Sequence, residues 1–206
     1  ILTHIRHSEK VFDMKKLLLI LIFTFSFQSL TKADDIRDFE IEGMSIGDSL
    51  LDYFSKEIID NFDRDYYPAS KKMHIKYIRS SKFKTYDTLT MSFKENDYKI
   101  YSITGSLWFD NFDTCNLKKD EIVEEITKSF NSTKLDQGTF KVPDLINDNS
   151  MKSQVEITLD DNSGLFSVQC VDWTKEVEDK NNWRDNLGVT VYSKDYELFL
   201  RNEAYK

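Results

Sequence analysis

The chain has 206 residues, of which 40% are hydrophobic, enough for one domain with a hydrophobic core or for two very small domains. Acidic side chains outnumber basic ones by 36 to 28, so the formal net charge is −8 at pH 7. Binding to nucleic acid or to anionic lipid headgroups requires clustered Lys and Arg. We therefore expect no nucleic-acid partner and no docking on anionic lipids.

Residues 14–33 have the layout of a secretory signal peptide. Lys15 and Lys16 form its positive start, residues 17–27 form an apolar run, and small side chains precede a cleavage position after Ala33. The apolar stretch of about 14 residues falls short of the roughly 20 that a membrane-spanning helix needs. The sequence therefore predicts a periplasmic or secreted protein with no stable membrane insertion after cleavage. An uncleaved anchor is the alternative.

Residues 1–13 precede the first methionine and show no clear apolar period. We interpret them as an upstream extension outside the working protein, the alternative being a short cytoplasmic extension. Cleavage after Ala33 would leave residues 34–206 as a single exported domain. The first 33 residues hold five basic and two acidic side chains, so this domain would carry a net charge of −11.

The first element expected in the domain is a helix over residues 45–54, extended towards Ile58. Ser45 is a suitable N-cap, and Asp48 three residues later completes a pattern similar to a capping box. The apolar side chains of Ile46, Leu50 and Phe54 would share one helical face. Residues 60–72, which are polar and aromatic and include Pro68, are expected to form a loop.

Two strands, over residues 83–93 and 98–109, are indicated by alternation of apolar and polar side chains, and residues 73–78 suggest a third. Gly105 interrupts the 98–109 segment, which is typical of a bulge or of a close backbone approach. An amphipathic helix is expected over 117–130, because Ile122, Ile126 and Phe130 form an apolar stripe.

Residues 137–138 and 143–150 are expected to be turn and loop. Strands follow at 155–159, 166–170 and 189–191, with a hairpin turn at 160–164 and a helical tail from residue 193. Runs of strands between single helices predict an α+β fold, with antiparallel β-sheet packed by two or three helices. The segments 34–112 and 113–206 resemble two copies of a degenerate helix-plus-meander unit, which would form either one sheet or two.

Two sequence patches, residues 38–55 and 101–126, together with the ending FLRNEAYK over 199–206, resemble a set of uncharacterised exported proteins from small-genome marine bacteria. That resemblance implies export and no particular activity. Gly43-Met44-Ser45 at the start of the first expected helix is similar to the BamE-like lipoproteins of outer-membrane assembly. The chain departs from those lipoproteins because no lipidated Cys follows its signal segment.

Cys115 and Cys170 are the only cysteines, and both follow the signal segment. An even pair in an oxidising compartment favours a disulfide. Such a bond would tie the 117–130 helix to the C-terminal sheet. Two buried free thiols are the alternative, and a redox-active pair is disfavoured because no Cys-x-x-Cys spacing is present.

Residue patterns for catalysis are missing from the sequence. His74 is the only histidine after residue 33, and no Gly-x-Ser-x-Gly segment supplies a nucleophile. The clustered carboxylates of Asp60, Asp63 and Asp65 and the pair Asp144 and Asp148 do not have the spacing of a calcium loop. We therefore expect no cofactor, no metal and no enzymatic activity.

The aromatic residues Phe62, Tyr66 and Tyr67 lie in the expected loop before Pro68, where they would form a binding surface. The ordinary alternative is that they belong to the rim of the core. The sequence predicts a non-catalytic interaction module of the cell envelope, binding another protein through this loop or an exposed sheet edge. The alternative function is binding of a small molecule or lipid between sheet and helices.

Overall fold

The computed structural model describes residues 35–61, 64–94, 97–141 and 149–206. The expected upstream extension and signal peptide, residues 1–33, lie outside the described residues. Among the residues that are described, no helix is long and apolar enough to cross a membrane.

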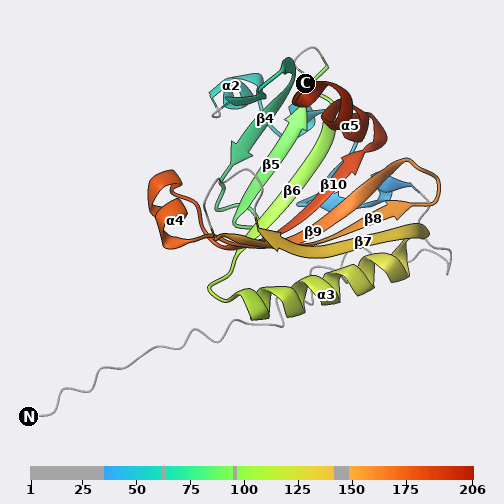
Figure 1. The fold of residues 1–206 in the computed structure, drawn as a ribbon. Helices are drawn as coiled ribbons and strands as arrows, with labels where there is room; N and C mark the ends of the chain where they lie inside the picture. Colours follow the sequence, from blue (N-terminus) through green and yellow to red (C-terminus); the bar gives the residue numbers. More distant parts are fainter. Residues whose placement is uncertain (1–34, 62–63, 95–96, 142–148) are drawn as a thin grey trace, which may run out of the picture. The chain divides into compact units, whose positions relative to one another are not determined.

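Eight antiparallel strands form one continuous sheet in the order β3-β4-β5-β6-β10-β9-β8-β7 (Figure 1). Their bounds are β3 Arg64–Tyr67, β4 Ser70–Ile78, β5 Thr88–Phe93, β6 Ile100–Trp108, β7 Ser132–Lys141, β8 Met151–Leu159, β9 Gly164–Asp172 and β10 Asn186–Ser193. The sheet is thus two four-stranded meanders whose last strands, β6 and β10, pair at its centre. In that pairing Gly105 lies opposite Val189. The predicted α+β class with antiparallel sheet is confirmed.

The sheet has one apolar and one polar face, because successive side chains of a strand point to opposite sides. A row of fully buried apolar residues crosses five strands on one face: Met91, Ile103, Val191, Phe166 and Ile157. The neighbouring row on the other face is polar: Thr90, Thr104, Thr190, Ser167 and Glu156. The hydrophobic alternation of the sequence therefore decides which side chains of these strands enter the core on the apolar face.

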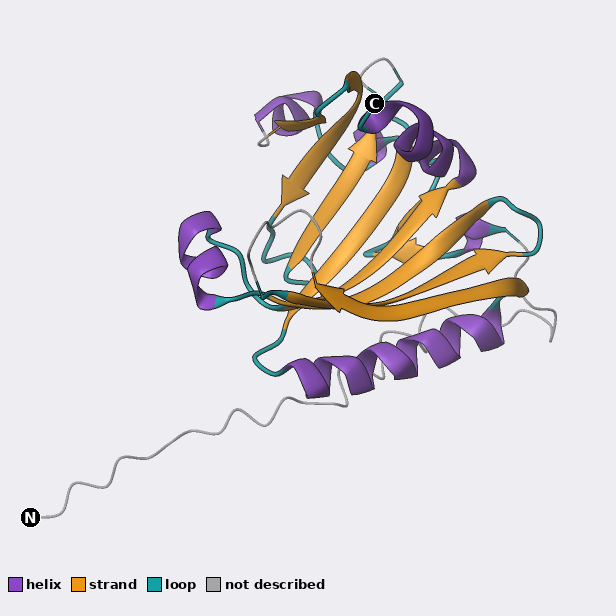
Figure 2. Cartoon of the chain, in the orientation of Figure 1, coloured by secondary structure: helices purple, strands orange, loops and turns teal. Residues whose placement is uncertain are grey.

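Helix α3 (Phe112–Ser129) covers the apolar face along β9 and also contacts β8 and β10 (Figure 2). It begins earlier than the predicted residue 117 because Asn111 caps it, the Asn111 side chain accepting the Thr114 N–H at 2.9 Å. Ile126 on α3 and Phe130 just after it are buried, as the predicted apolar stripe required.

The segment before β3 completes the cover of the apolar face. It contains a 3₁₀ turn (Ile36–Asp38) and the small hairpin of β1 (Glu40–Ile41) and β2 (Met44–Ser45). Phe39 packs edge-on against the rings of Phe130 and Phe166. In the hairpin turn, the carboxylate of Glu42 accepts the backbone N–H groups of Lys84, Thr85 and Tyr86, and so fixes the loop before β5.

The C-terminal segment packs on the opposite, polar side of the sheet. Helix α5 (Lys194–Phe199) continues into a π-helical turn (Leu200–Ala204). Its Tyr196 and Phe199 form a buried cluster with Tyr67, Met73 and Tyr101. A shorter helix, α4 (Lys175–Asn181), connects β9 to β10.

The predicted helix over residues 45–58 is wrong. This segment contains β2, a turn, a 3₁₀ turn (Leu50–Asp52) and the short helix α2 (Lys56–Asn61). Gly47 has φ of +97°, which a right-handed helix does not allow. Asp48 still accepts the Ser45 N–H at 2.9 Å, but the Ser45 hydroxyl donates to the Phe39 carbonyl and caps no helix.

Two predicted loops are also wrong. The described part of residues 60–72 includes β3 and the start of β4, with only Pro68 and Ala69 between these strands. Gln137 and Gly138, expected in a turn, lie in the middle of β7. By contrast, the predicted hairpin at 160–164 is confirmed and joins β8 to β9 through Asn162, which has φ of +58°.

Candidate functional site

The two cysteines lie at disulfide distance, with an S–S separation of 2.02 Å and Cα atoms 6.0 Å apart. Cys115 is in the first turn of α3, and Cys170 is on the apolar face of β9. The pair therefore joins helix to sheet as the sequence predicted. Both residues are buried.

The predicted aromatic binding surface is not brought together. Phe62 lies outside the described residues, and Tyr66 is 40% exposed on the edge strand β3. Tyr67 is only 7% exposed, and its hydroxyl is hydrogen-bonded to that of Tyr196, which also contacts the Ser92 hydroxyl at 2.9 Å. Burial raises the pKa of Tyr67 and of Tyr196. Tyr67 is therefore a core residue and not part of a binding surface.

The candidate chemical groups of the sequence are dispersed. His74 is buried in β4 and contacts the rings of Tyr66 and Phe93. Asp60 is exposed and paired with Lys56. Asp63, Asp144 and Asp148 lie outside the described residues. Within the described part of the chain, no three His, Cys, Asp or Glu side chains are grouped to hold a metal ion.

One carboxyl group with a strongly shifted pKa was not singled out by the sequence. Burial raises the pKa of Asp185 to about 6. The backbone N–H of Trp173, which donates to Asp185 Oδ1 at 2.7 Å, opposes this shift, while the nearby carboxylates of Asp172 and Glu178 add to it. The group lies at the base of the α4 connection and has no nucleophile or cation partner that would make it catalytic among the described residues.

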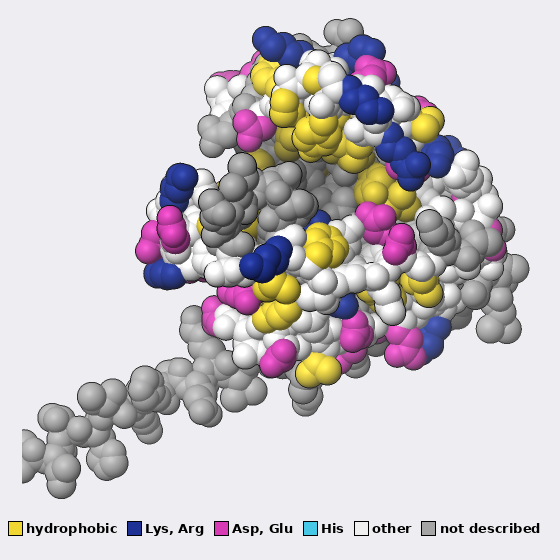
Figure 3. All heavy atoms as spheres, in the orientation of Figure 1, with side chains coloured by type: hydrophobic (Ala, Val, Ile, Leu, Met, Phe, Trp, Pro, Cys, Tyr) yellow, Lys and Arg dark blue, Asp and Glu magenta, His cyan; other side chains and the backbone are white. Residues whose placement is uncertain are grey.

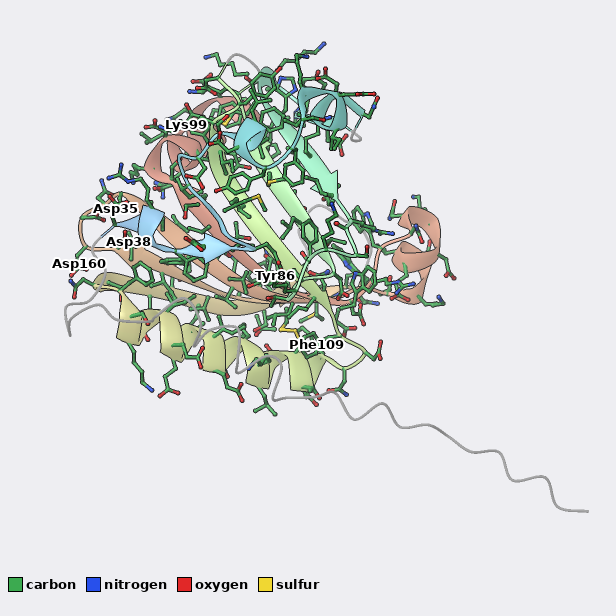
Figure 4. All side chains as sticks on the ribbon, turned by 180° about the vertical axis from the view of Figure 1, so that it is seen from behind. Asp35, Asp38, Tyr86, Lys99, Phe109 and Asp160 are labelled. Atoms are coloured by element: carbon green, nitrogen blue, oxygen red, sulfur yellow. A yellow bond between two sulfur atoms is a disulfide. The ribbon has the colours of Figure 1, made fainter. Side chains whose placement is uncertain are left out.

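A cavity of about 250 Å³ lies where the 3₁₀ turn at residues 36–38 meets the starts of β6 and α5. Figure 4 shows two of its lining residues, Asp35 and Lys99, on the side of the sheet that faces away in Figure 1. The charged side chains around this cavity are largely paired within the chain. Arg37 donates a hydrogen bond to Asp35, and Lys194 donates one to Glu197 at 2.6 Å. The arrangement is that of a structural junction.

The polar face of the sheet is hollowed below α5 (Figure 3). Short polar side chains lie on this face, such as Thr104 and Thr190, whose hydroxyls lie 2.8 Å apart. These two hydroxyls are hydrogen-bonded to one another across the strands.

The edge strand β7 is the most accessible element of the sheet. It is ten residues long, and all its residues from 135 to 141 are exposed. It pairs with β8 in continuous register from Lys134 to Lys141, so it has no β-bulge over this length. Leu135 continues the buried apolar row beyond Ile157, yet it is 56% exposed because α3 packs mainly on β9.

The other edge of the sheet is different. Strand β3 has four residues, its register shifts between Tyr66 and Tyr67, and Pro68 follows it directly. Short length, irregular register and proline are three of the features by which proteins block edge pairing, and charged side chains are another. Between residues 134 and 141, β7 has none of the first three, and its charged residues are Lys134, Asp136 and Lys141.

Neither the known protein families, nor the curated proteins, nor the solved structures contain a match to this chain.

Proposed function

We propose that this protein is a non-catalytic interaction module of the bacterial envelope, and that it binds an extended segment of another protein along β7. The observation that carries the proposal is the edge of β7, which is regular from residue 134 to 141 and exposed from residue 135 to 141. Its main-chain groups on the outer side would form the ladder with the added strand, which is the general mode of β-strand addition.

The side chains of β7 give this edge a preference for an amphipathic partner strand. Leu135 extends the apolar face, while Phe140 lies on the polar face and is 41% exposed. An incoming strand would place one apolar side chain beside each of them, because residues on neighbouring strands pair on the same face. Export, which residues 14–33 predict, would bring the edge into contact with envelope proteins.

The test is a pair of matched double variants. Leu135→Lys with Phe140→Lys puts two charges on the edge, which should abolish pairing with an apolar strand. Leu117→Lys with Leu198→Lys makes the same change at two exposed leucines on α3 and α5. Cross-linking in envelopes of an expressing bacterium should capture one partner with the wild type and the helix variant, and lose it with the β7 variant.

The partner recovered should also protect the backbone amides of β7 from hydrogen exchange. Failure of the wild type to capture any protein would contradict the proposal. Equal capture by the two double variants would contradict the assignment to β7, provided that both melt cooperatively like the wild type.

A further inference from the structure

Two arginines from distant parts of the chain lie against one tryptophan ring. Trp108 ends β6, Arg79 directly follows β4, and Arg184 precedes β10. The guanidinium carbons of Arg79 and Arg184 lie 5.7 and 4.5 Å from the centre of the Trp108 ring. The backbone N–H of Trp108 donates to Asp87 Oδ2 at 2.8 Å, which fixes the end of the strand that carries the ring.

Neither guanidinium forms an ion pair with any described residue, and the same holds for Lys82 and Lys84 in the loop after Arg79. Arg37 and Arg201, in contrast, are paired with Asp35 and Glu197. A group of unpaired cations is unusual in a chain with a net charge of −8. Two guanidinium groups against one ring, neither neutralised by a carboxylate, raise the local positive potential, which favours the binding of an anion.

A cavity of about 450 Å³, open to solvent, adjoins this cluster. Its walls include Arg79, the hydroxyl residues Ser80 and Ser81, and the rings of Phe83, Tyr86 and Trp108. Asp87 is the only carboxylate in the lining, and it is engaged by the Trp108 N–H. The Ser80 oxygen accepts the Lys82 N–H at 3.1 Å, which leaves its own O–H able to donate.

We propose that this cavity binds an organic phosphate monoester, with the phosphate against Arg79 and the two serines and the apolar part of the ligand against Phe83. The second guanidinium, of Arg184, lies against the Trp108 ring in the cavity wall and adds positive charge, which favours a phosphate dianion over a single carboxylate. The planar fork of the Arg79 guanidinium can donate two parallel hydrogen bonds to such an anion, and the serine hydroxyls supply further donors. This site uses strands β4 and β6, so it is independent of the β7 edge.

The experiment is calorimetric titration of the intact chain with phenyl phosphate, inorganic phosphate and benzoate at low ionic strength. Phenyl phosphate should bind most tightly, because it alone combines the dianion with an apolar ring. Arg79→Gln should weaken binding by about tenfold, the usual effect of losing a charged hydrogen bond. Arg184→Gln should weaken it less, because Arg184 lies against the Trp108 ring and is not one of the residues that line the cavity. Arg37→Gln removes one positive charge elsewhere and should bind like the wild type.

Three outcomes would overturn the proposal. They are no binding of phenyl phosphate to the wild type at about 10 mM, which corresponds to very weak affinity; equal binding by Arg79→Gln and Arg37→Gln; and benzoate binding as tightly as phenyl phosphate. Inorganic phosphate binding as tightly as phenyl phosphate would overturn the apolar part of the assignment. Arg79 and Arg184 are exposed, so their substitution should leave the fold intact. Circular dichroism of each variant checks this and so distinguishes loss of the site from loss of the fold.

Discussion

Gly105 is the position at which the apolar face comes closest to the loop before β5. A Cβ atom at this residue would lie 2.6 Å from three carbons of the Tyr86 ring, which lies over this face of the sheet (Figure 4). We predict that Gly105→Ala lowers the free energy of unfolding by about 1–3 kcal/mol, because the ring must leave a well-packed position. Urea denaturation of the purified variant measures the change.

Gly138→Ala is the matched control for that substitution. Gly138 lies in the exposed strand β7, where the nearest atom to an added Cβ is 3.7 Å away. It should leave stability nearly unchanged. If both variants lose the same stability, the effect comes from the loss of a strand glycine and not from contact with Tyr86.

Asp185 gives the folded state a defined pH dependence. Burial raises its pKa to about 6, above the value of about 3.9 in an unfolded chain. Because the folded protein holds this proton more tightly than the unfolded chain does, protonation of Asp185 stabilises the folded state. This stabilisation is complete below about pH 4 and is lost as the pH rises from about 4 to 6. At pH 7 the ionised group is therefore a cost, which solvent screening limits to about 1 kcal/mol.

We predict that Asp185→Asn raises the melting temperature by about 2–4 °C at pH 7 and has little effect near pH 4. The amide oxygen can still accept the Trp173 N–H. Thermal melts between pH 4 and pH 8 measure the difference. Asp136→Asn, at an exposed residue of β7, should shift the melting temperature at neither pH. A difference between Asp185→Asn and wild type that does not vary with pH would contradict this account.

Among the elements, α3 is the one that is covalently tied to the sheet. The cysteine pair closes a sequence separation of 55 residues, for which the chain-entropy contribution is about 4 kcal/mol. We predict that Cys115→Ala with Cys170→Ala lowers the free energy of unfolding by up to that amount. Urea denaturation with and without dithiothreitol tests it: reductant should destabilise the wild type and leave the variant unchanged.

The elements that the sequence predicts well are those with one buried face. In β8 every second side chain enters the core, and in α3 every third or fourth side chain faces the sheet, so the apolar period is visible in the sequence. Strand β7 was missed because its residues 135–141 are all exposed, so no burial imposes alternation on them. The helix over 45–58 was predicted from spacing alone, which does not register the positive φ of Gly47.

The candidate sites were predictable to different degrees. Two cysteines that follow a segment predicted to be an export signal are enough to predict their pairing. No local pattern links Arg79, Trp108 and Arg184, which meet only because β4, β6 and β10 run in one sheet. The predicted surface at Tyr66 and Tyr67 failed because the pairing of β3 with β4 turns Tyr67 towards the C-terminal helix.

For the molecule as a whole, the two proposed binding regions use different parts of one sheet. The edge β7 belongs to the second meander, and the Arg79 cluster forms at the end of β4 and β6 in the first. The apolar face is occupied by α3 and by the segment before β3. Binding along β7 and binding of an anion can therefore be examined separately in the same protein.

The central position of β10 has a consequence for when the fold can form. Among the described strands β10 comes last in sequence, yet it joins the two meanders. Domains normally form in order as a chain is synthesised. Here the sheet cannot close until residue 193 has been made, and until then β6 lacks its neighbour. Late closure of this kind is what the predicted export would require, because an exported chain crosses the membrane before it folds.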